Sequence, residues 1–238
     1  MSRSRYSLAI ETSTRACELA LGRDDGLIET VTLPSQRRHH VGLMPGIDNL
    51  CRNHAIGARD IEEVHVSLGP GSFTGLRVAV AAAKMLAIAA DVKIVGVSTL
   101  WVVAHNGPAE HQHVAACLNL KRDTVYCAVY RREAEEMVPV LEPGLRTLTE
   151  LLHQAPRPVA LLGEMLPQLP RESCEGISVM PPEQARPRGE TVWRLGRRLA
   201  AAGRFTDPME LEPMYVRRPE AVELWERRHP SVAVNRPG

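Results

Sequence analysis

Short apolar runs separated by polar turns open the chain. They predict three strands, at Tyr6–Glu11, Ala16–Gly22 and Leu27–Leu33, which form an antiparallel meander because the turns between them are short. A helical period follows at about residues 42–54, with four apolar residues on one face: Leu43, Ile47, Leu50 and Cys51. A strand at 63–68, a long apolar helix from Leu76 to Ala90 and a strand at 93–97 complete this half.

Three antiparallel strands followed by alternating helix and strand are typical of the ribonuclease-H-like half of actin, sugar kinases and Hsp70. The pattern partly repeats after residue 104. It predicts a hairpin of strands 114–120 and 124–130, a third strand at 137–141, a helix at 147–154, a strand at 159–162 and an amphipathic helix at 191–202. Frequent prolines interrupt this second half, which we therefore expect to be loop-rich and reduced.

The sequence thus predicts an α/β protein with two ribonuclease-H-like halves of the actin, sugar-kinase and Hsp70 type. The first domain covers residues 1–104 and carries partner-facing helices. The second, reduced domain covers residues 105–218, and its last helix can return to the first domain. Residues 219–238 form a polar, proline-broken tail.

The helix from Leu76 to Ala90 is apolar on nearly every face. Seven of its fifteen residues are alanine, and its charged residues are Arg77 and Lys84. A helix of this kind is covered on more than one side. Two arrangements remain open: a helix buried within its own fold, or a helix with one face on its own sheet and another on a partner subunit.

Composition narrows the function class. At 238 residues, with 44% apolar and 24% charged residues, the chain reads as a soluble globular protein. A net charge of +1 and an aromatic content of 4% argue against a dedicated nucleic-acid binder. We expect no membrane association, because no window reaches the length needed to cross a bilayer. Five scattered cysteines without a C-x-x-C motif predict a reduced, cytoplasmic protein.

The most distinctive local pattern is the glycine-rich turn Gly69-Pro70-Gly71-Ser72-Phe73-Thr74-Gly75 between strand 63–68 and the apolar helix. A helix start after such a turn favours anions, because its first N–H groups are unpaired. The turn lacks the lysine of a P-loop and the spacing of G-x-G-x-x-G. The simpler interpretation is a tight turn that lets the strand and the helix pack closely.

No other motif predicts catalysis. The two places where actin-like ATPases hold phosphate, Glu11–Thr14 and Asn119–Thr124, contain no glycine, which weakens nucleotide binding. The pair His111 and His113, with His105 nearby, reads as a solvated loop rather than a metal site. Ser72 has no histidine or acidic residue at a sequence spacing that indicates a catalytic triad. We therefore predict no catalytic residue, no metal and no intrinsic cofactor.

Several segments together resemble the TsaB (YeaZ) family: residues 8–14, 43–50, 119–130, 212–217 and above all 69–77. The resemblance covers nearly the whole chain up to about Arg218. It implies a non-catalytic scaffold for the catalytic subunit TsaD in threonylcarbamoylation of the adenosine next to the tRNA anticodon. The ATPase TsaE joins the complex, ATP or ADP is expected only there, and contact with tRNA is indirect. The same surface permits homodimers when TsaD is absent.

The family comparison also predicts why this chain is not the enzyme. TsaD-type sequences place two metal-binding histidines one helical turn apart after the strand that matches 93–97. Thr99 and Val103 stand at these positions here, and a valine cannot bind metal. The chain therefore resembles an inactive paralogue.

The resemblance further implies an interface built from two helices, around Leu43–Cys51 and Leu76–Ile88. We expect Val80→Glu or Ala83→Arg to break the complex while the isolated fold survives. The predicted partner-binding residues are Leu43, Ile47, Leu50, Cys51, Leu76, Arg77, Val80, Ala83, Lys84 and Ala87.

The alternative function is a stand-alone actin-like ATPase or small-molecule kinase. It predicts micromolar nucleotide binding by the isolated protein that Thr12→Ala or Ser13→Ala weakens. A peptidase, an old label for this superfamily, has no support in the residues.

Overall fold

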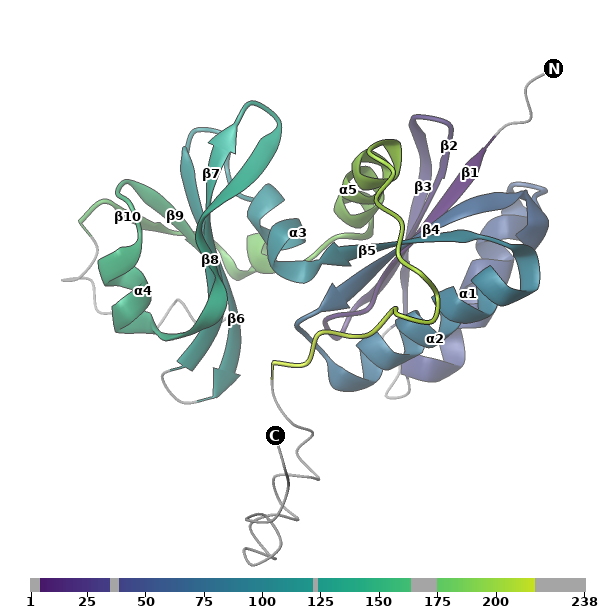
Figure 1. Cartoon of the computed structure of the whole chain (residues 1–238), viewed down its shortest axis with the longest axis horizontal. Coiled ribbons are helices and arrows are strands. Elements are labelled where there is room, and N and C mark those ends of the chain that lie inside the picture. The colour runs from purple at the N-terminus through teal and green to yellow at the C-terminus, as the bar shows by residue number, and fades with distance from the viewer. Residues whose placement is uncertain (1–4, 35–38, 122–123, 164–174, 217–238) are drawn as a thin grey trace, which may run out of the picture.

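The structure is a computed structural model that describes residues 5–34, 39–121, 124–163 and 175–216 (Figure 1). Its first half contains β1 (Tyr6–Glu11), β2 (Cys17–Arg23), β3 (Gly26–Leu33), α1 (His39–Asn53), η1 (Ala58–Asp60), β4 (Ile61–Gly69), α2 (Phe73–Ala90), β5 (Lys93–Ser98) and α3 (Thr99–His105). The second half contains β6 (His113–Lys121), β7 (Thr124–Glu133), β8 (Glu136–Thr147), α4 (Leu148–Gln154), β9 (Val159–Leu162), β10 (Ile177–Val179), η4 (Pro182–Ala185) and α5 (Gly189–Ala201).

The two sheets have the same topology. The first has the order β3-β2-β1-β4-β5, with β1 antiparallel to β2 and parallel to β4. The second has the order β10-β9-β6-β7-β8, in which β6 takes the place of β1. Three antiparallel strands followed by two parallel ones form each sheet, which confirms the predicted fold class.

The second half is reduced in its helices rather than in its sheet. Its sheet has five strands, as many as the first, and β8 is longer than the predicted strand 137–141. The sequence did not predict β10, a strand of three residues that pairs with β9. Among the described residues, the short helix α4 packs on the outer face of the second sheet. The longer helices α1 and α2 cover one face of the first sheet (Figure 1).

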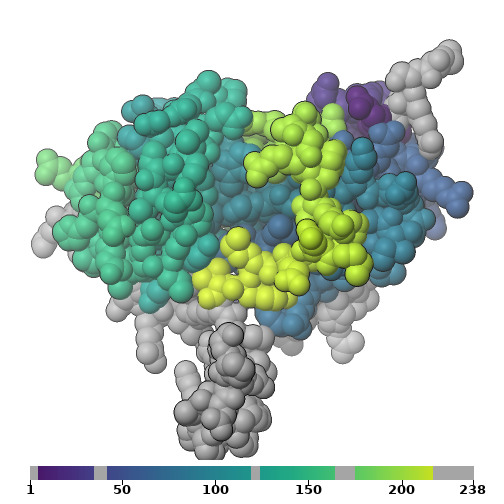
Figure 2. Space-filling model, in the orientation of Figure 1, coloured from purple at the N-terminus to yellow at the C-terminus, as the bar shows by residue number. Residues whose placement is uncertain are grey.

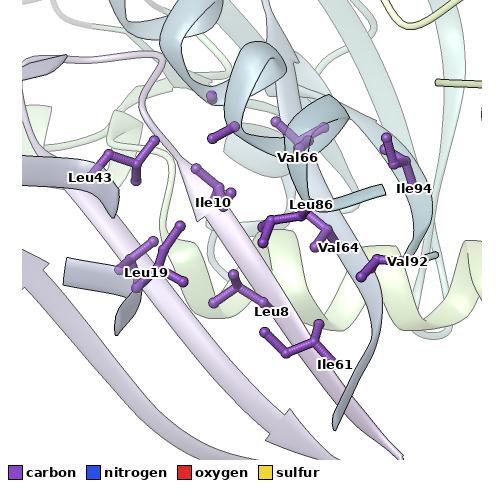
Figure 3. Packing of buried hydrophobic residues seen from close by; sticks show 14 of the residues in the cluster. Leu8, Ile10, Leu19, Leu43, Ile61, Val64, Val66, Leu86, Val92 and Ile94 are labelled. Atoms are coloured by element: carbon purple, nitrogen blue, oxygen red, sulfur yellow. The ribbon is translucent and has the colours of Figure 1, made fainter. Parts of the chain in front are cut away.

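The main hydrophobic core lies between the first sheet and the helices α1 and α2. Leu8, Ile10 and Leu19 from the sheet meet Leu43 and Leu86 from the helices, and all are buried (Figure 3). The alternation of the strands explains this, because every second side chain points to the helical layer. The intervening residues, such as Ala9 and Ala20, line the opposite face of the same sheet.

The opposite face is covered by α5, which follows all the strands of the second half in the sequence. Val192 and Leu195 are fully buried against Ala9 and Ala20. The Trp193 indole N–H donates a 2.8 Å hydrogen bond to the Ser7 hydroxyl, which satisfies two buried polar groups. The first half is therefore completed by a helix that lies more than eighty residues further along the chain.

The short helix α3 lies between the two sheets (Figure 1). Val102 packs into the cluster under α5, whereas Leu100 and Val103 pack into the core of the second sheet. The indole N–H of Trp101 also donates to the carbonyl of Met137 at 3.1 Å. Because its opposite faces belong to different cores, α3 joins the two halves into one packed unit.

The helix α2 is the central helix of the first half. It begins at Phe73, three residues earlier than predicted, because the Ser72 hydroxyl accepts a hydrogen bond from the Gly75 N–H and caps it. Its 18 residues and mean hydropathy of 1.6 satisfy the length and composition of a membrane span. The expectation that no window reaches that length is therefore wrong. A core helix passes the same test, and Leu76, Ala79 and Ala83 of α2 are fully buried.

A strap of residues 211–216 follows α5 and crosses between the two halves. In Figure 2 the chain after α5 lies between the second half and α2. Leu211 is 1% exposed in the main core, and the Met214 N–H donates to the Leu68 carbonyl at 2.7 Å. The Tyr126 hydroxyl of the second half lies 3.7 Å from the Met214 sulfur. The predicted tail, residues 219–238, lies outside the described residues.

Candidate functional site

The carboxyl ends of β1 and β4 meet at the glycine-rich turn. The Ser72 N–H donates to the Ser13 carbonyl at 2.6 Å, and the Thr12 hydroxyl donates to the Gly75 carbonyl at 2.8 Å. Thr12 and Ser13 are 4% exposed. Of the N–H groups that we expected to attract an anion, that of Ser72 is bonded to the turn after β1 and that of Gly75 is bonded to the Ser72 hydroxyl. The turn after β1 therefore packs directly against the start of α2.

Two glycines make this close contact sterically feasible. A Cβ on Gly71 would lie 2.3 Å from the Ser13 carbonyl oxygen, and one on Gly75 would lie 2.0 Å from that of Thr12. Any side chain at either position would collide with backbone. This confirms the simpler interpretation of the turn, since its glycines serve close packing between β1, β4 and α2.

Below the turn lies a buried carboxylate, Glu11, which is 1% exposed. Its Oε1 accepts hydrogen bonds from the backbone N–H and the hydroxyl of Ser13. Among the described residues, its Oε2 has no partner at hydrogen-bond distance, and the Ser67 hydroxyl is the other polar group beside the carboxylate. Burial raises the pKa of Glu11 above its ordinary value, although the bond from Ser13 opposes the change. Glu11 is thus a partly satisfied core residue rather than an exposed acid.

Thr99 and Val103, which we expect to match the metal-binding histidines of TsaD-type sequences, are also buried. Thr99 and Val103 are both 0% exposed and lie one turn apart on α3. The Thr99 hydroxyl is 2.9 Å from that of Ser67, and one of the two donates a hydrogen bond to the other. Val103 packs into the second core. The second predicted phosphate position, 119–124, falls on side chains outside the described residues, apart from Thr124.

The histidines near residues 105–113 are not all in a solvated loop, because His113 begins β6, and His111 and His113 are half-buried. The Nδ1 of His105 lies 2.9 Å from the Trp101 carbonyl, and its ring packs edge-on to that of Trp101. Burial lowers the pKa of His105 to about 4. Across residues 5–34, 39–121, 124–163 and 175–216, no group of three or more histidine, cysteine or acidic side chains is arranged to hold a metal ion.

The structure changes the list of residues that a partner could touch. Eight of the ten predicted partner-binding residues lie in the core of the first half or at its edge: Leu43, Ile47, Leu50, Cys51, Leu76, Val80, Ala83 and Ala87. Arg77 is exposed and Lys84 is half-buried. The apolar face at i, i+4, i+7 and i+11 points to the protein's own sheet, so these eight side chains do not form an outer surface.

The outer face of α1 and α2 is still unusually apolar. Met85 is 64% exposed, Ile88 is 79% exposed and Met44 is 43% exposed. Ala81 and Ala89 are also exposed on α2. We call these five residues the outer helical face. Ala81, Met85, Ile88 and Ala89 follow one another at helical spacing along one side of α2, and a contiguous apolar patch of this kind marks a contact site.

Beside the outer helical face, Arg77 is held by aromatic rings. Its guanidinium lies 4.0 Å from the centre of the Phe73 ring, and its Nε donates to the Tyr215 hydroxyl at 3.0 Å. The Phe73 and Tyr215 rings are 4.6 Å apart. The sequence did not predict this cluster, because Tyr215 is 138 positions away from Arg77. The cluster fixes the strap against the glycine-rich turn.

Comparisons with known proteins agree with one another. A family model described as "tRNA N6-adenosine threonylcarbamoyltransferase" (TsaD) matches residues 30–174. The Bacillus subtilis "tRNA threonylcarbamoyladenosine biosynthesis protein TsaB" is 30% identical, over 92% of this chain and 96% of its own. The Escherichia coli TsaB protein is 29% identical, over 88% and 94%.

A solved structure supports the same assignment. "YeaZ from Pseudomonas aeruginosa" superposes with a TM-score of 0.71 and 22% identity, over 89% of this chain and all of that one. This likeness shows a shared fold, and the sequence identity to the curated relatives extends it to family. The chain belongs to the TsaB (YeaZ) family of tRNA threonylcarbamoyladenosine biosynthesis proteins.

Proposed function

We propose that this protein acts in threonylcarbamoyladenosine biosynthesis as a non-catalytic scaffold for the TsaD subunit. The observation that carries this proposal is the closed corner at the ends of β1 and β4. Ser13 and Thr12 bond to the turn that would otherwise face a phosphate, and Thr99 and Val103 are buried in place of metal ligands. Because Thr12 and Ser13 pack into the corner where a phosphate would bind, we expect this protein to bind and position the catalytic subunit rather than to catalyse the reaction itself.

The outer helical face is the surface that we assign to TsaD. Exposed Met85 and Ile88 supply adaptable apolar contact area, and Arg77 supplies a charge that is already positioned by its rings. Small residues at 81 and 89 allow a second helix to approach closely. We further propose that TsaE joins this pair with ATP or ADP, that tRNA is contacted indirectly, that the protein works in the cytoplasm, and that a homodimer forms through the same face when TsaD is absent.

The test is co-elution with purified TsaD in size-exclusion chromatography with light scattering. Met85→Glu places a charge on the outer helical face, and we expect it to weaken the complex at least about tenfold, because an unpaired charge is costly in an interface. Met209→Glu is the matched control, since Met209 is 81% exposed and lies outside this face. It should elute as the wild-type protein does.

The variants Val80→Glu and Ala83→Arg, which the sequence pointed to, are unsuitable for this test. Both positions are buried, so a charge there would unfold the first half and abolish binding for an unrelated reason. If Met85→Glu and Ile88→Glu both fold and still bind TsaD as tightly as wild type, the interface is elsewhere.

A second measurement addresses the non-catalytic role. Calorimetry of the isolated protein with ATP and magnesium should show no binding heat, because the corner is occupied by Ser13. Micromolar binding that Thr12→Ala weakens would contradict the scaffold and support a stand-alone ATPase or kinase.

A further inference from the structure

The second sheet carries two cysteines that lie directly opposite each other. Cys117 on β6 pairs with Cys127 on β7 in the antiparallel register, and they are 3% and 0% exposed. Both are free thiols, and they pack in the same cluster beneath α4, on the outer face of the sheet (Figure 1). We propose that this pair is a redox-sensitive site, at which a peroxide converts the two thiols into a cross-strand disulfide.

The register suits such a bond. Residues directly opposite in an antiparallel pair have Cα atoms about 4.5–5.5 Å apart, and a disulfide accepts about 4.4–6.8 Å. The two side chains also point to the same face of the sheet and lie in the same buried cluster under α4. Closing the bond therefore requires rotation of two side chains rather than movement of the strands.

Cys127 is fully buried, and the side of Gly144 is where a small oxidant would reach it. Its partner on β8 is Gly144, which has no side chain to cover the sulfur. The space above Gly144 is filled by the guanidinium of Arg146, whose Nη1 lies 3.0 Å from where a Cβ would stand. Arg146 is half-buried, and its Nε donates to the Gln154 amide oxygen at 3.2 Å. Rotation of this long side chain would open access to Cys127.

The surroundings also distinguish the two thiols. The Arg146 Nη1 donates to the Cys127 carbonyl at 3.3 Å, so its guanidinium lies beside Cys127. The neighbouring Cys117 and this guanidinium hold the pKa of Cys127 below its ordinary value, against the effect of burial, whereas Cys127 and burial raise the pKa of Cys117. Because the thiolate is the nucleophile, the sulfur beside the positive charge, Cys127, is the first to react and Cys117 is the second.

The reaction balances with hydrogen peroxide as the oxidant. The Cys127 thiolate attacks one peroxide oxygen, the O–O bond breaks, and Cys127 becomes a sulfenic acid while hydroxide leaves. The Cys117 sulfur then attacks the Cys127 sulfur, the S–O bond breaks, and water leaves. Two electrons pass from the sulfurs to the peroxide, so two thiols and one hydrogen peroxide give one disulfide and two waters.

The other described cysteines lack this arrangement. Burial and the nearby Glu11 raise the pKa of Cys17 to about 11, and burial raises the pKa of Cys51. Each is a single buried thiol. They serve as internal controls. Cys174 lies outside the described residues, so the experiment uses a Cys174→Ser background.

The test is peptide mapping by mass spectrometry, without reduction, after treatment with hydrogen peroxide. We expect a crosslinked peptide pair that joins Cys117 to Cys127 and has lost two hydrogen atoms, and its complete loss on reduction. Cys117→Ser should give no crosslink but a Cys127 sulfenic acid that dimedone traps. Oxidation of exposed Met85 and Met209 shows that the peroxide dose was sufficient.

Arg146→Gln tests the charge argument, because glutamine keeps a polar side chain near Gly144 but removes the positive charge beside Cys127. It should slow crosslinking at neutral pH, because the Cys127 thiolate is then less favoured. Cys51→Ser should crosslink at the wild-type rate. The proposal is wrong if wild-type protein shows no link between Cys117 and Cys127 once Met85 is fully oxidised, whatever happens at the variants. It is also wrong if Cys17 or Cys51 reacts first.

Discussion

At the scale of single residues, the glycine-rich turn determines how β1 and α2 meet. Gly75→Ala would put a methyl group 2.0 Å from the Thr12 carbonyl oxygen, so the backbone must shift. We expect a loss of about 3 kcal/mol or more in the free energy of unfolding, measured by urea denaturation. The matched control is Gly42→Ala on α1, where a Cβ meets nothing within 4 Å. That change should be neutral or stabilise by up to about 1 kcal/mol.

A second residue-scale prediction concerns His105. Burial lowers its pKa to about 4, against an ordinary value of 6.5, so the unfolded chain binds a proton that the folded protein does not. Its contribution is fully present above pH 6.5 and is lost as the pH falls towards 4, by about 3 kcal/mol. The unfolding free energy of His105→Phe should depend less steeply on pH over this range. An unchanged slope would show that His105 titrates normally.

At the scale of elements, the strap of residues 211–216 is anchored by one buried side chain. Leu211 is 1% exposed in the main core, whereas neighbouring Met209 is 81% exposed. Leu211→Ala should destabilise the protein by about 2–5 kcal/mol, because it leaves a cavity under the strap. Met209→Ala should change stability by less than about 0.5 kcal/mol. Thermal and urea unfolding of the two variants measure the difference, and equal effects would place the strap outside the folded unit.

At the scale of the whole molecule, the two halves depend on each other. The face of the first sheet that holds Ala9, Ala20 and Val95 is buried by α5, whose residues come after the second half. A fragment of residues 1–104 would expose that face. We expect this fragment to bind a hydrophobic dye and to lose its near-ultraviolet circular dichroism. A fragment of residues 1–218 should not bind the dye and should keep the near-ultraviolet signal of the whole protein. A fragment 1–104 that unfolds cooperatively would show that this half is an independent domain.

Much of this architecture was readable from local pattern. Short apolar runs separated by polar turns placed the bounds of β1, β2 and β3 within one residue, because both features are local properties of the chain. The family motif at residues 69–77 was equally local. The orientation of α2 could not be predicted from the local sequence. A helix that is apolar on every side carries no signal for which face meets the sheet. Val80 and Ala83 were therefore assigned to a partner although they are buried.

The sequence by itself determined the order of strands and helices, the glycine turn and the family, since each depends on residues that are close together along the chain. The tertiary structure decided which groups share a surface. It brought Arg77 to Tyr215, closed the corner with Ser13, exposed Met85 and Ile88, and aligned Cys117 with Cys127. These contacts join distant positions, and the packing of whole elements sets them.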